Sequence, residues 1–219
     1  MSARAQDPTR ESVPLTVVRR TVAGLLRMVF RIRVIGADAL PRHGPVLVAG
    51  NHTGFLDGPI VYMMLPRPSA FLVKSELYSG PWAKLLAFAH QIPVHRGSPD
   101  RTALRRALDV LAGGGVLGVF PEGTRGEGRL ESVQHGIGYL ALRAGCPIVP
   151  VVCLGTAEAL PKGKKLPRLR APVDVIFGPA FELEVTGDPR ARSTIADAAE
   201  QVRRHLLAHL DAVSPPDAA

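Results

Sequence analysis

The sequence predicts an α/β fold in which helices flank a mostly parallel central sheet, with an amphipathic helix at its N-terminal end. Two observations lead to this fold class. Six short runs are continuously apolar, which is typical of strands covered on both faces. Longer segments with helical patterns separate the runs, and alternating strands and helices build parallel sheets with helices on both sides. A chain of 219 residues that is 46% hydrophobic and 21% charged can bury one core, so we expect a single domain.

Two segments precede this domain. Residues 1–13 are polar, and we expect them to form a mobile tail. Residues 14–33 predict an amphipathic helix, because apolar side chains recur at steps of three and four residues with arginines between them. Arginines interrupt every apolar stretch, so a helix lying in the membrane interface fits better than one crossing the bilayer, and packing on the protein's own core is the alternative. The apolar positions are Leu15, Val18, Val22, Leu25, Val29 and Ile32, and the arginines are Arg19, Arg20, Arg27 and Arg31.

The domain is expected over residues 34–213, followed by a second mobile tail at 214–219. Asp100 is placed to cap a helix that Gly113 to Gly115 would end, and a Ser/Thr cap would start the last helix. A basic, proline-bearing loop spans residues 160–172. The expected strands are residues 45–51, 69–74, 91–96, 115–123, 147–155 and 173–181, and the expected helices are 58–65, 81–90, 100–112, 135–144 and 193–210.

The formal net charge of +8 calls for an anionic partner, which can be a nucleic acid, a membrane surface or a phosphorylated substrate. No basic run interleaves with aromatic residues as a platform for single-stranded nucleic acid does, so we expect no nucleic-acid partner. The two cysteines, Cys146 and Cys153, lie in apolar surroundings without a CxxC pair. They indicate neither a disulfide framework nor a zinc site, and they suit a reducing cytosolic compartment.

A histidine and an aspartate follow the first expected strand, in the stretch GNHTGFLDG. His52 lies just past the strand and Asp57 opens the next helix, so a short turn can bring the carboxylate back to one imidazole nitrogen. A carboxylate in that place fixes the tautomer and stabilises the imidazolium, as in a general base. The alternative is that Asp57 only caps the helix and His52 is a turn residue. Since no G-x-S-x-G elbow occurs and the cysteines are expected to be buried, the base would activate a hydroxyl of the substrate.

Positive charge is expected at the same edge of the sheet. Arg96 ends a strand in PVHRG and Arg125 follows another in FPEGTRGEG, and two guanidinium groups suit a phosphate. Solvated surface arginines are the alternative. Glu122 lies at the mouth of a buried strand, so it needs a partner such as Arg125 or a substrate hydroxyl. The glycines of this stretch let the backbone approach a ligand, but the pattern is neither a Walker A loop nor a dinucleotide fingerprint.

At these residues the sequence resembles the 1-acylglycerol-3-phosphate acyltransferases, whose members carry an H-x4-D motif. Four blocks match in order: NHTGFLD resembles the family's NHxxxxD, IPVHRG its second block with the arginine, FPEGTR its third block and IVPV its fourth. The resemblance covers roughly residues 33–180 and implies that residues 34–213 form an acyltransferase domain. It also implies association with the membrane, which favours an interfacial position for residues 14–33, and a peripheral location on the cytoplasmic face.

The resemblance implies a role for each block. His52 would deprotonate the free hydroxyl of 1-acylglycerol-3-phosphate, with Asp57 orienting it, and the hydroxyl would attack the thioester of acyl-CoA or acyl carrier protein. We expect no metal and no cofactor beyond that thioester, and backbone amides near the His/Asp turn would stabilise the oxyanion. Arg96 would bind the acceptor phosphate. The further substrate-binding residues would be Glu122, Gly123, Thr124 and Arg125 of the third block, and Lys74, for which a solvated lysine is an equal alternative.

Gln134 stands where relatives often carry a lysine, so the acceptor could be a different lipid. A lipid-binding relative without turnover and a thioesterase in which His52 activates water are the other possibilities. His205 and His209 are four residues apart on the last expected helix, but no third ligand accompanies them, which favours a solvated helix face over a metal site.

Overall fold

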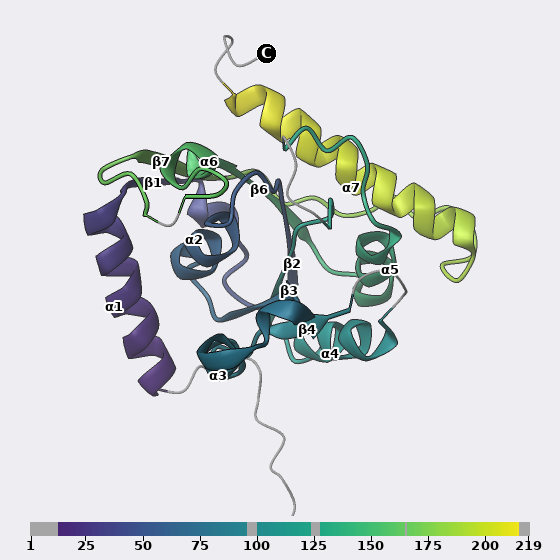
Figure 1. Cartoon of the computed structure of the whole chain (residues 1–219). Helices are drawn as coiled ribbons and strands as arrows, with labels where there is room; N and C mark the ends of the chain where they lie inside the picture. The colour runs from purple at the N-terminus through teal and green to yellow at the C-terminus, as the bar shows by residue number, and fades with distance from the viewer. Residues whose placement is uncertain (1–12, 96–99, 124–127, 165, 215–219) are drawn as a thin grey trace, which may run out of the picture.

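A seven-stranded sheet with helices on both faces forms the centre of the molecule (Figure 1). The computed structural model describes residues 13–95, 100–123, 128–164 and 166–214. The strand order is β1-β7-β6-β2-β5-β3-β4, and within the described residues every pair is parallel except the antiparallel pair β6 and β7. This confirms the mostly parallel α/β fold. The strands are β1 Arg31–Ile35, β2 Val46–Gly50, β3 Ser69–Lys74, β4 Ile92–Val94, β5 Val116–Val119, β6 Ile148–Leu154 and β7 Pro172–Phe177.

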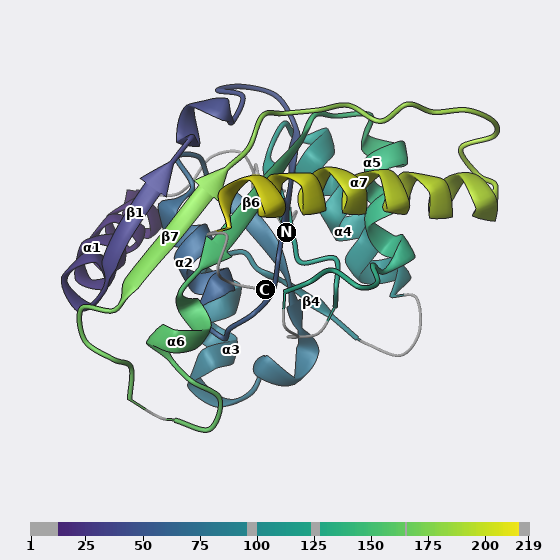
Figure 2. The same ribbon diagram turned by 90° about the horizontal axis from the view of Figure 1, so that it is seen from above.

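Two hydrophobic cores lie on opposite faces of the sheet. Helices α1, α2, α3 and α6 cover one face, and α4, α5 and α7 cover the other (Figures 1 and 2). The central strands β2, β5 and β6 are buried on both sides, which explains their continuous apolar sequence. The helices are α1 Val13–Val29, α2 Asp57–Met64, α3 Gly80–Phe88, α4 Arg101–Ala112, α5 His135–Ala144, α6 Thr156–Ala159 and α7 Arg192–Val213, with short 3-10 turns η1 Ala37–Ala39 and η2 Ser75–Leu77.

The first helix is shorter than the sequence predicts. It ends at Val29, and Arg31–Ile35 form the edge strand β1, paired in parallel with β7. The expected helix over residues 14–33 is therefore wrong in its last turn. The reason is that burial in β1 alternates along the strand, with Ile32 and Val34 turned inward, and Ile32 also fits the three- and four-residue steps of the helix.

Helix α1 packs on the body of the protein with one side and exposes apolar residues on the other. Leu15 and Ala23 are buried, and the guanidinium of Arg19 donates to the carbonyls of Leu65 and Arg67 at 3.1 and 3.0 Å. Packing on the protein's own core, the alternative for this helix, therefore accounts for the inner side. No helix of the described residues is long and apolar enough to cross a bilayer. The exposed apolar residues of α1 are Val13, Val17, Val18, Leu25 and Met28.

The expected helix ends are partly confirmed. Asp100 caps α4, since its Oδ1 accepts from the amide of Ala103 at 2.9 Å, and Gly113 ends that helix. The Ser/Thr cap of the last helix is wrong, because α7 begins at Arg192 and its N-cap residue is Ala191, whose side chain makes no cap hydrogen bond. The expected tails fall almost wholly outside the described residues.

One edge of the sheet collects the polar residues singled out in the sequence. Strands β2 to β6 all run in the same direction and end there, so His52, Lys74, Glu122 and Thr156 emerge at this edge. Because β7 runs antiparallel to β6, it starts at the same edge, and residues 155–164 and 166–171 of the connection lie there. We call this the catalytic edge.

Candidate active site

His52 and Asp57 form a hydrogen-bonded pair at the catalytic edge. Nδ1 of His52 lies 2.9 Å from Oδ2 of Asp57, as the sequence spacing predicts. Asp57 is fully buried, whereas the His52 side chain is 16% exposed. The aspartate therefore holds the imidazole from inside the protein, and part of the His52 side chain reaches the surface.

The surroundings of Asp57 decide which nitrogen of His52 carries the proton. Its Oδ2 also accepts from the backbone amides of Thr53 at 2.7 Å and Gly54 at 2.8 Å, and its Oδ1 accepts from the hydroxyl of Thr156. Two N–H groups already point at Oδ2, so a proton on that atom would clash with them and Nδ1 must be the donor. Nε2 of the neutral ring is then left as the acceptor, which is the form that a general base needs.

The cap interpretation of Asp57 does not hold. Asp57 is the first residue of α2, and the N-cap residue is Leu56, whose side chain makes no cap hydrogen bond. Its carboxylate turns back to the preceding loop and to His52 instead. Its place in the first helical turn still favours a negative charge, because the free amides of a helix start are positive.

Two aromatic rings support one face of the His52 ring. The ring of His52 lies on Phe120 with centroids 4.6 Å apart, and Phe120 in turn packs against Phe71. Glycines make room for these rings: a Cβ on Gly118 would clash with the ring of Phe71, and one on Gly50 would come within 3.0 Å of Phe120. The two small residues therefore let the sheet hold the imidazole in one orientation.

Sequence reasoning missed two polar residues of this site. Thr156, fully buried at the start of α6, donates to Asp57, and its hydroxyl also lies 3.1 Å from that of Thr53. Asn51 ties the end of β2 to β6 by two hydrogen bonds with the backbone of Cys153, at 2.8 and 3.1 Å. Thr156 follows a buried strand at the catalytic edge, so the rule that singled out His52 could have found it.

Glu122 contacts the same turn. It is half-buried, and its Oε1 accepts from the backbone amide of His52 at 2.9 Å. Burial raises the pKa of Glu122, and the bond from His52 offsets part of that shift. The expected need for a partner is thus met by the backbone of the His/Asp turn.

Gly123 adopts a left-handed conformation with φ of 69°, which glycine adopts without strain, and turns the chain beside Gln134.

The amides of the turn are not available for an oxyanion. Those of Thr53 and Gly54 donate to Asp57, and that of His52 donates to Glu122. The expectation that backbone amides next to the His/Asp pair stabilise the oxyanion is therefore wrong for these three groups. They form the frame that holds the carboxylates.

Lys74 ends β3 at the catalytic edge and forms an ion pair with Glu76 at 3.0 Å; the Lys74 side chain is 42% exposed and that of Glu76 is 59% exposed. This geometry fits the solvated alternative. Three other expected residues, Arg96, Thr124 and Arg125, lie outside the described residues, so their place relative to His52 stays a prediction.

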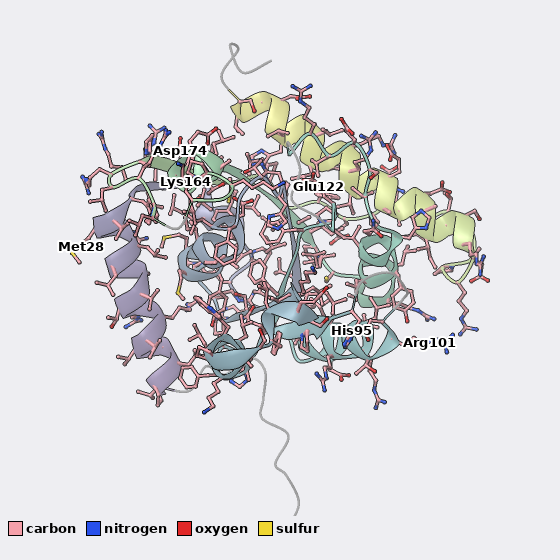
Figure 3. The ribbon with its side chains drawn as sticks, in the orientation of Figure 1. Met28, His95, Arg101, Glu122, Lys164 and Asp174 are labelled. Carbon is pink, nitrogen blue, oxygen red and sulfur yellow. The ribbon has the colours of Figure 1, made fainter. Side chains whose placement is uncertain are left out.

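A second His/Asp pair with the same spacing lies at the end of β4. His95, labelled in Figure 3, is exposed, and its Nδ1 lies 3.0 Å from Oδ2 of Asp100. Because Asp100 also accepts from the amides of Ala103 and His95, its pKa lies well below its usual range. This pair fixes the start of α4.

The two cysteines and the two histidines of the last helix have structural surroundings that account for them. Burial raises the pKa of Cys146 to about 11 and that of Cys153 well above its usual value, which fits inert thiols. His205 stacks on Phe181, and Nε2 of His209 lies 3.0 Å from the carbonyl of Ile176.

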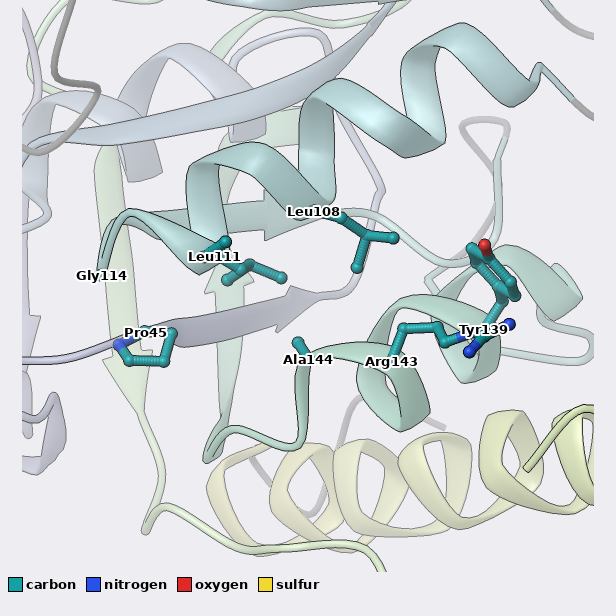
Figure 4. Close-up of a pocket in the computed structure, with 8 residues that line it drawn as sticks. Pro45, Leu108, Leu111, Gly114, Tyr139, Arg143 and Ala144 are labelled. Atoms are coloured by element: carbon teal, nitrogen blue, oxygen red, sulfur yellow. The ribbon is translucent and has the colours of Figure 1, made fainter. Parts of the chain in front are cut away.

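A surface hollow of about 450 Å³ lies between α4 and α5 (Figure 4). Its lining includes Pro45 and Gly114, which directly precede the buried strands β2 and β5. It therefore lies at the amino ends of the strands, opposite the catalytic edge, and we do not assign it to the chemistry of His52.

Comparisons with known proteins find one family and several relatives. The sequence model of a family described as Acyltransferase matches residues 31–154. The chain is 28% identical over 179 residues to a 1-acyl-sn-glycerol-3-phosphate acyltransferase of Chlamydomonas reinhardtii, covering 78% of this chain and 52% of the relative. A chloroplastic protein of the same name from Arabidopsis thaliana is 27% identical over 168 residues, covering 73% of this chain and 46% of the relative. The chain thus spans about half the length of these two relatives.

A shorter relative and a solved structure complete the comparison. A 1-acyl-sn-glycerol-3-phosphate acyltransferase of Bacillus subtilis is 27% identical over 138 residues, which are 61% of this chain and 69% of the relative. The crystal structure of the 1-acyl-sn-glycerophosphate acyltransferase PlsC from Thermotoga maritima superposes with a TM-score of 0.65 at 22% identity. The superposition covers 92% of this chain and 81% of PlsC, and it shows a shared fold.

Proposed function

Because this chain belongs to the Acyltransferase family, we propose that it moves a fatty acyl chain from a thioester to the free hydroxyl of 1-acylglycerol-3-phosphate. The names of the relatives support this acceptor, and acyl-CoA or acyl carrier protein would supply the thioester. The observation that carries the proposal is the geometry of His52, whose Nδ1 is held by a buried aspartate so that Nε2 can accept a proton.

The proposed reaction uses His52 twice. Nε2 takes the proton of the lipid hydroxyl while the hydroxyl oxygen attacks the thioester carbon, and Asp57 stabilises the imidazolium that forms. When the tetrahedral intermediate collapses, the carbon–sulfur bond breaks and the departing sulfur takes the proton from Nε2. The products are an ester and a free thiol, and no acyl group is attached to the protein at any step.

We assign the phosphate of the acceptor to the basic residues of the second and third blocks. Arg96 would bind it directly, since a guanidinium offers two parallel donors to a phosphate. Thr124 and Arg125 would contribute, Gly123 would shape the backbone beside them, and Glu122 would support the site through its bond to the amide of His52. Lys74 is the weakest candidate because Glu76 already pairs with it.

The enzyme would work on lipid at a membrane surface. We propose a peripheral association on the cytoplasmic face, in which the exposed apolar side of α1 lies in the interface. The inner side of α1 is bound to the protein, so the helix would attach the domain closely to the bilayer.

Release of free thiol tests the proposed activity. Purified protein is mixed with acyl-CoA or with acyl carrier protein carrying the same acyl chain, with and without lysophosphatidate, and the thiol is followed with a chromogenic disulfide. Release that requires lysophosphatidate supports the proposal. Release without any acceptor would indicate a thioesterase, release only with another lysolipid would change the acceptor, and no release with either thioester would indicate a lipid-binding protein.

A further inference from the structure

The connection between α6 and β7 is a basic surface segment that the proposed reaction leaves unused. We define the basic loop as residues 160–164 and 166–171, which follow α6 and precede Pro172 of β7. Both ends of the loop lie at the catalytic edge, and Figure 2 shows it beside α6 and the start of β1. It therefore lies on the side of the molecule from which His52 must meet a lipid.

Hydrogen bonds join the basic loop to α6, to the end of α1 and to the start of β1. The amide of Arg168 donates to the carbonyl of Ala159 at 2.8 Å, and the amide of Arg170 donates to the carbonyl of Val29 at 2.6 Å. The amide of Arg31 donates to the carbonyl of Ala171 at 2.9 Å. In Figure 3, Met28 and Lys164 lie on the same flank of the molecule. The loop and the last turn of α1 thus form one continuous surface.

The charge of this surface is positive. Residues 160–172 contain no acidic residue. Arg27 and Arg31 add positive charge from the end of α1 and the start of β1. The nearby Asp174 is already paired with Arg33, at 2.5 Å between Oδ2 and the guanidinium. The exposed basic residues of the loop are Lys162, Lys164, Arg168 and Arg170.

Large apolar side chains project from the same surface. Leu166 is 83% and Leu169 is 76% exposed, and Met28 at the end of α1 is 65% exposed. A site for a soluble anion needs basic groups, but exposed leucines contribute nothing to binding such an anion. Basic groups that flank exposed leucines suit an anionic bilayer, because the cations bind headgroups while the apolar side chains enter the acyl boundary.

We propose that the basic loop, together with the last turn of α1, docks on the surface of an anionic lipid bilayer and holds the catalytic edge against it. The inference extends the proposed function by naming a second membrane contact besides the length of α1. Its test measures binding to vesicles without substrate, so the result does not depend on turnover.

The experiment compares the full chain with two double variants. Partitioning is measured by flotation with vesicles of phosphatidylcholine and with vesicles in which about one third of the lipid is phosphatidylglycerol. We expect wild-type protein to prefer the anionic vesicles. Lys162→Glu with Lys164→Glu should lower the partition coefficient on anionic vesicles by at least about tenfold, and Leu166→Ser with Leu169→Ser should lower it by about tenfold on both kinds.

A matched control separates location from total charge. Arg105→Glu with Arg204→Glu makes the same change in net charge on α4 and α7, which cover the other face of the sheet. We expect it to keep binding within about threefold of wild type. All substituted residues except Leu166 and Leu169 are exposed polar groups, and the melting temperature of every variant is checked against wild type.

Four results would overturn the docking surface. Equal losses in the loop variant and the control would show that only total charge matters. Unchanged partitioning of both loop variants would show that the loop does not touch the bilayer. If vesicle binding is unchanged and the leucine variant turns a dimer into a monomer in light scattering, the surface belongs to a contact with a second copy. If vesicle binding is unchanged and the lysine variant loses binding of desulfo-coenzyme A, the surface belongs to a soluble anion.

Discussion

Replacing Asp57 by asparagine should remove the charge from the site and leave its shape intact. The amide oxygen of asparagine can take the place of Oδ2 and accept from His52, Thr53 and Gly54. The amide nitrogen then faces the hydroxyl of Thr156, which can accept in place of donating. The fold should therefore survive, while the imidazolium formed during the reaction loses its negative partner.

The size of the effect follows from the geometry. Nδ1 and Oδ2 are 2.9 Å apart, which places the centres of the two charges about 4 Å from each other. At an effective dielectric constant of about 20, two such charges interact by about 4 kcal/mol. The amide dipole retains part of this, so we expect kcat to fall by about a hundredfold to a thousandfold.

The assay is acceptor-dependent release of thiol, measured beside the melting temperature of each protein. Glu200→Gln is a matched control, because it removes a carboxylate from the ion pair with Arg203 on α7, away from the catalytic edge. We expect that control to turn over like wild type. A well-folded Asp57→Asn enzyme with kcat within about threefold of wild type would refute the role of the buried charge.

Three further variants test other parts of the site. Thr156→Val removes one donor from the buried carboxylate of Asp57, so the free energy of unfolding in urea should fall by about 1.5 to 3 kcal/mol, and an unchanged value would contradict the bond. Burial raises the pKa of Glu122 in the folded state, so at this carboxyl the native protein binds more protons than the unfolded chain, and its contribution to stability should decline as pH rises above about 4.5. Thermal melts of Glu122→Gln across this pH range should lose that decline. If the decline persists in the variant, another group causes it. Arg96→Ala should raise KM for the phosphorylated acceptor by about tenfold or more with little change in kcat, whereas an unchanged KM would place the phosphate elsewhere.

The strands were predictable where burial is complete. Strands β2, β5 and β6 are covered on both faces, so their sequences are apolar throughout and stand out from the helices. Strand β1 was missed because it is a half-buried edge strand whose alternation also fits a helical repeat. Helix α6, Thr156–Ala159, is too short to show a period.

The catalytic edge was predictable by one rule, and the detail within it was not. Polar residues that follow parallel strands gather at one edge, which brings His52, Asp57 and Glu122 together. The stacking of Phe120 under His52 and the bonds of Asn51 to the backbone of β6 depend on which strands are neighbours. That order is a property of the folded sheet, and the sequence alone did not reveal it.

Mass spectrometry of the lipid product tests most directly whether His52 is the base. Wild-type protein and a His52→Ala variant are incubated with acyl-CoA and lysophosphatidate, after circular dichroism and thermal melts have shown that the variant is folded. We predict phosphatidate from the wild type and none above background from the variant. Equal rates of phosphatidate formation by the two proteins would contradict the central claim.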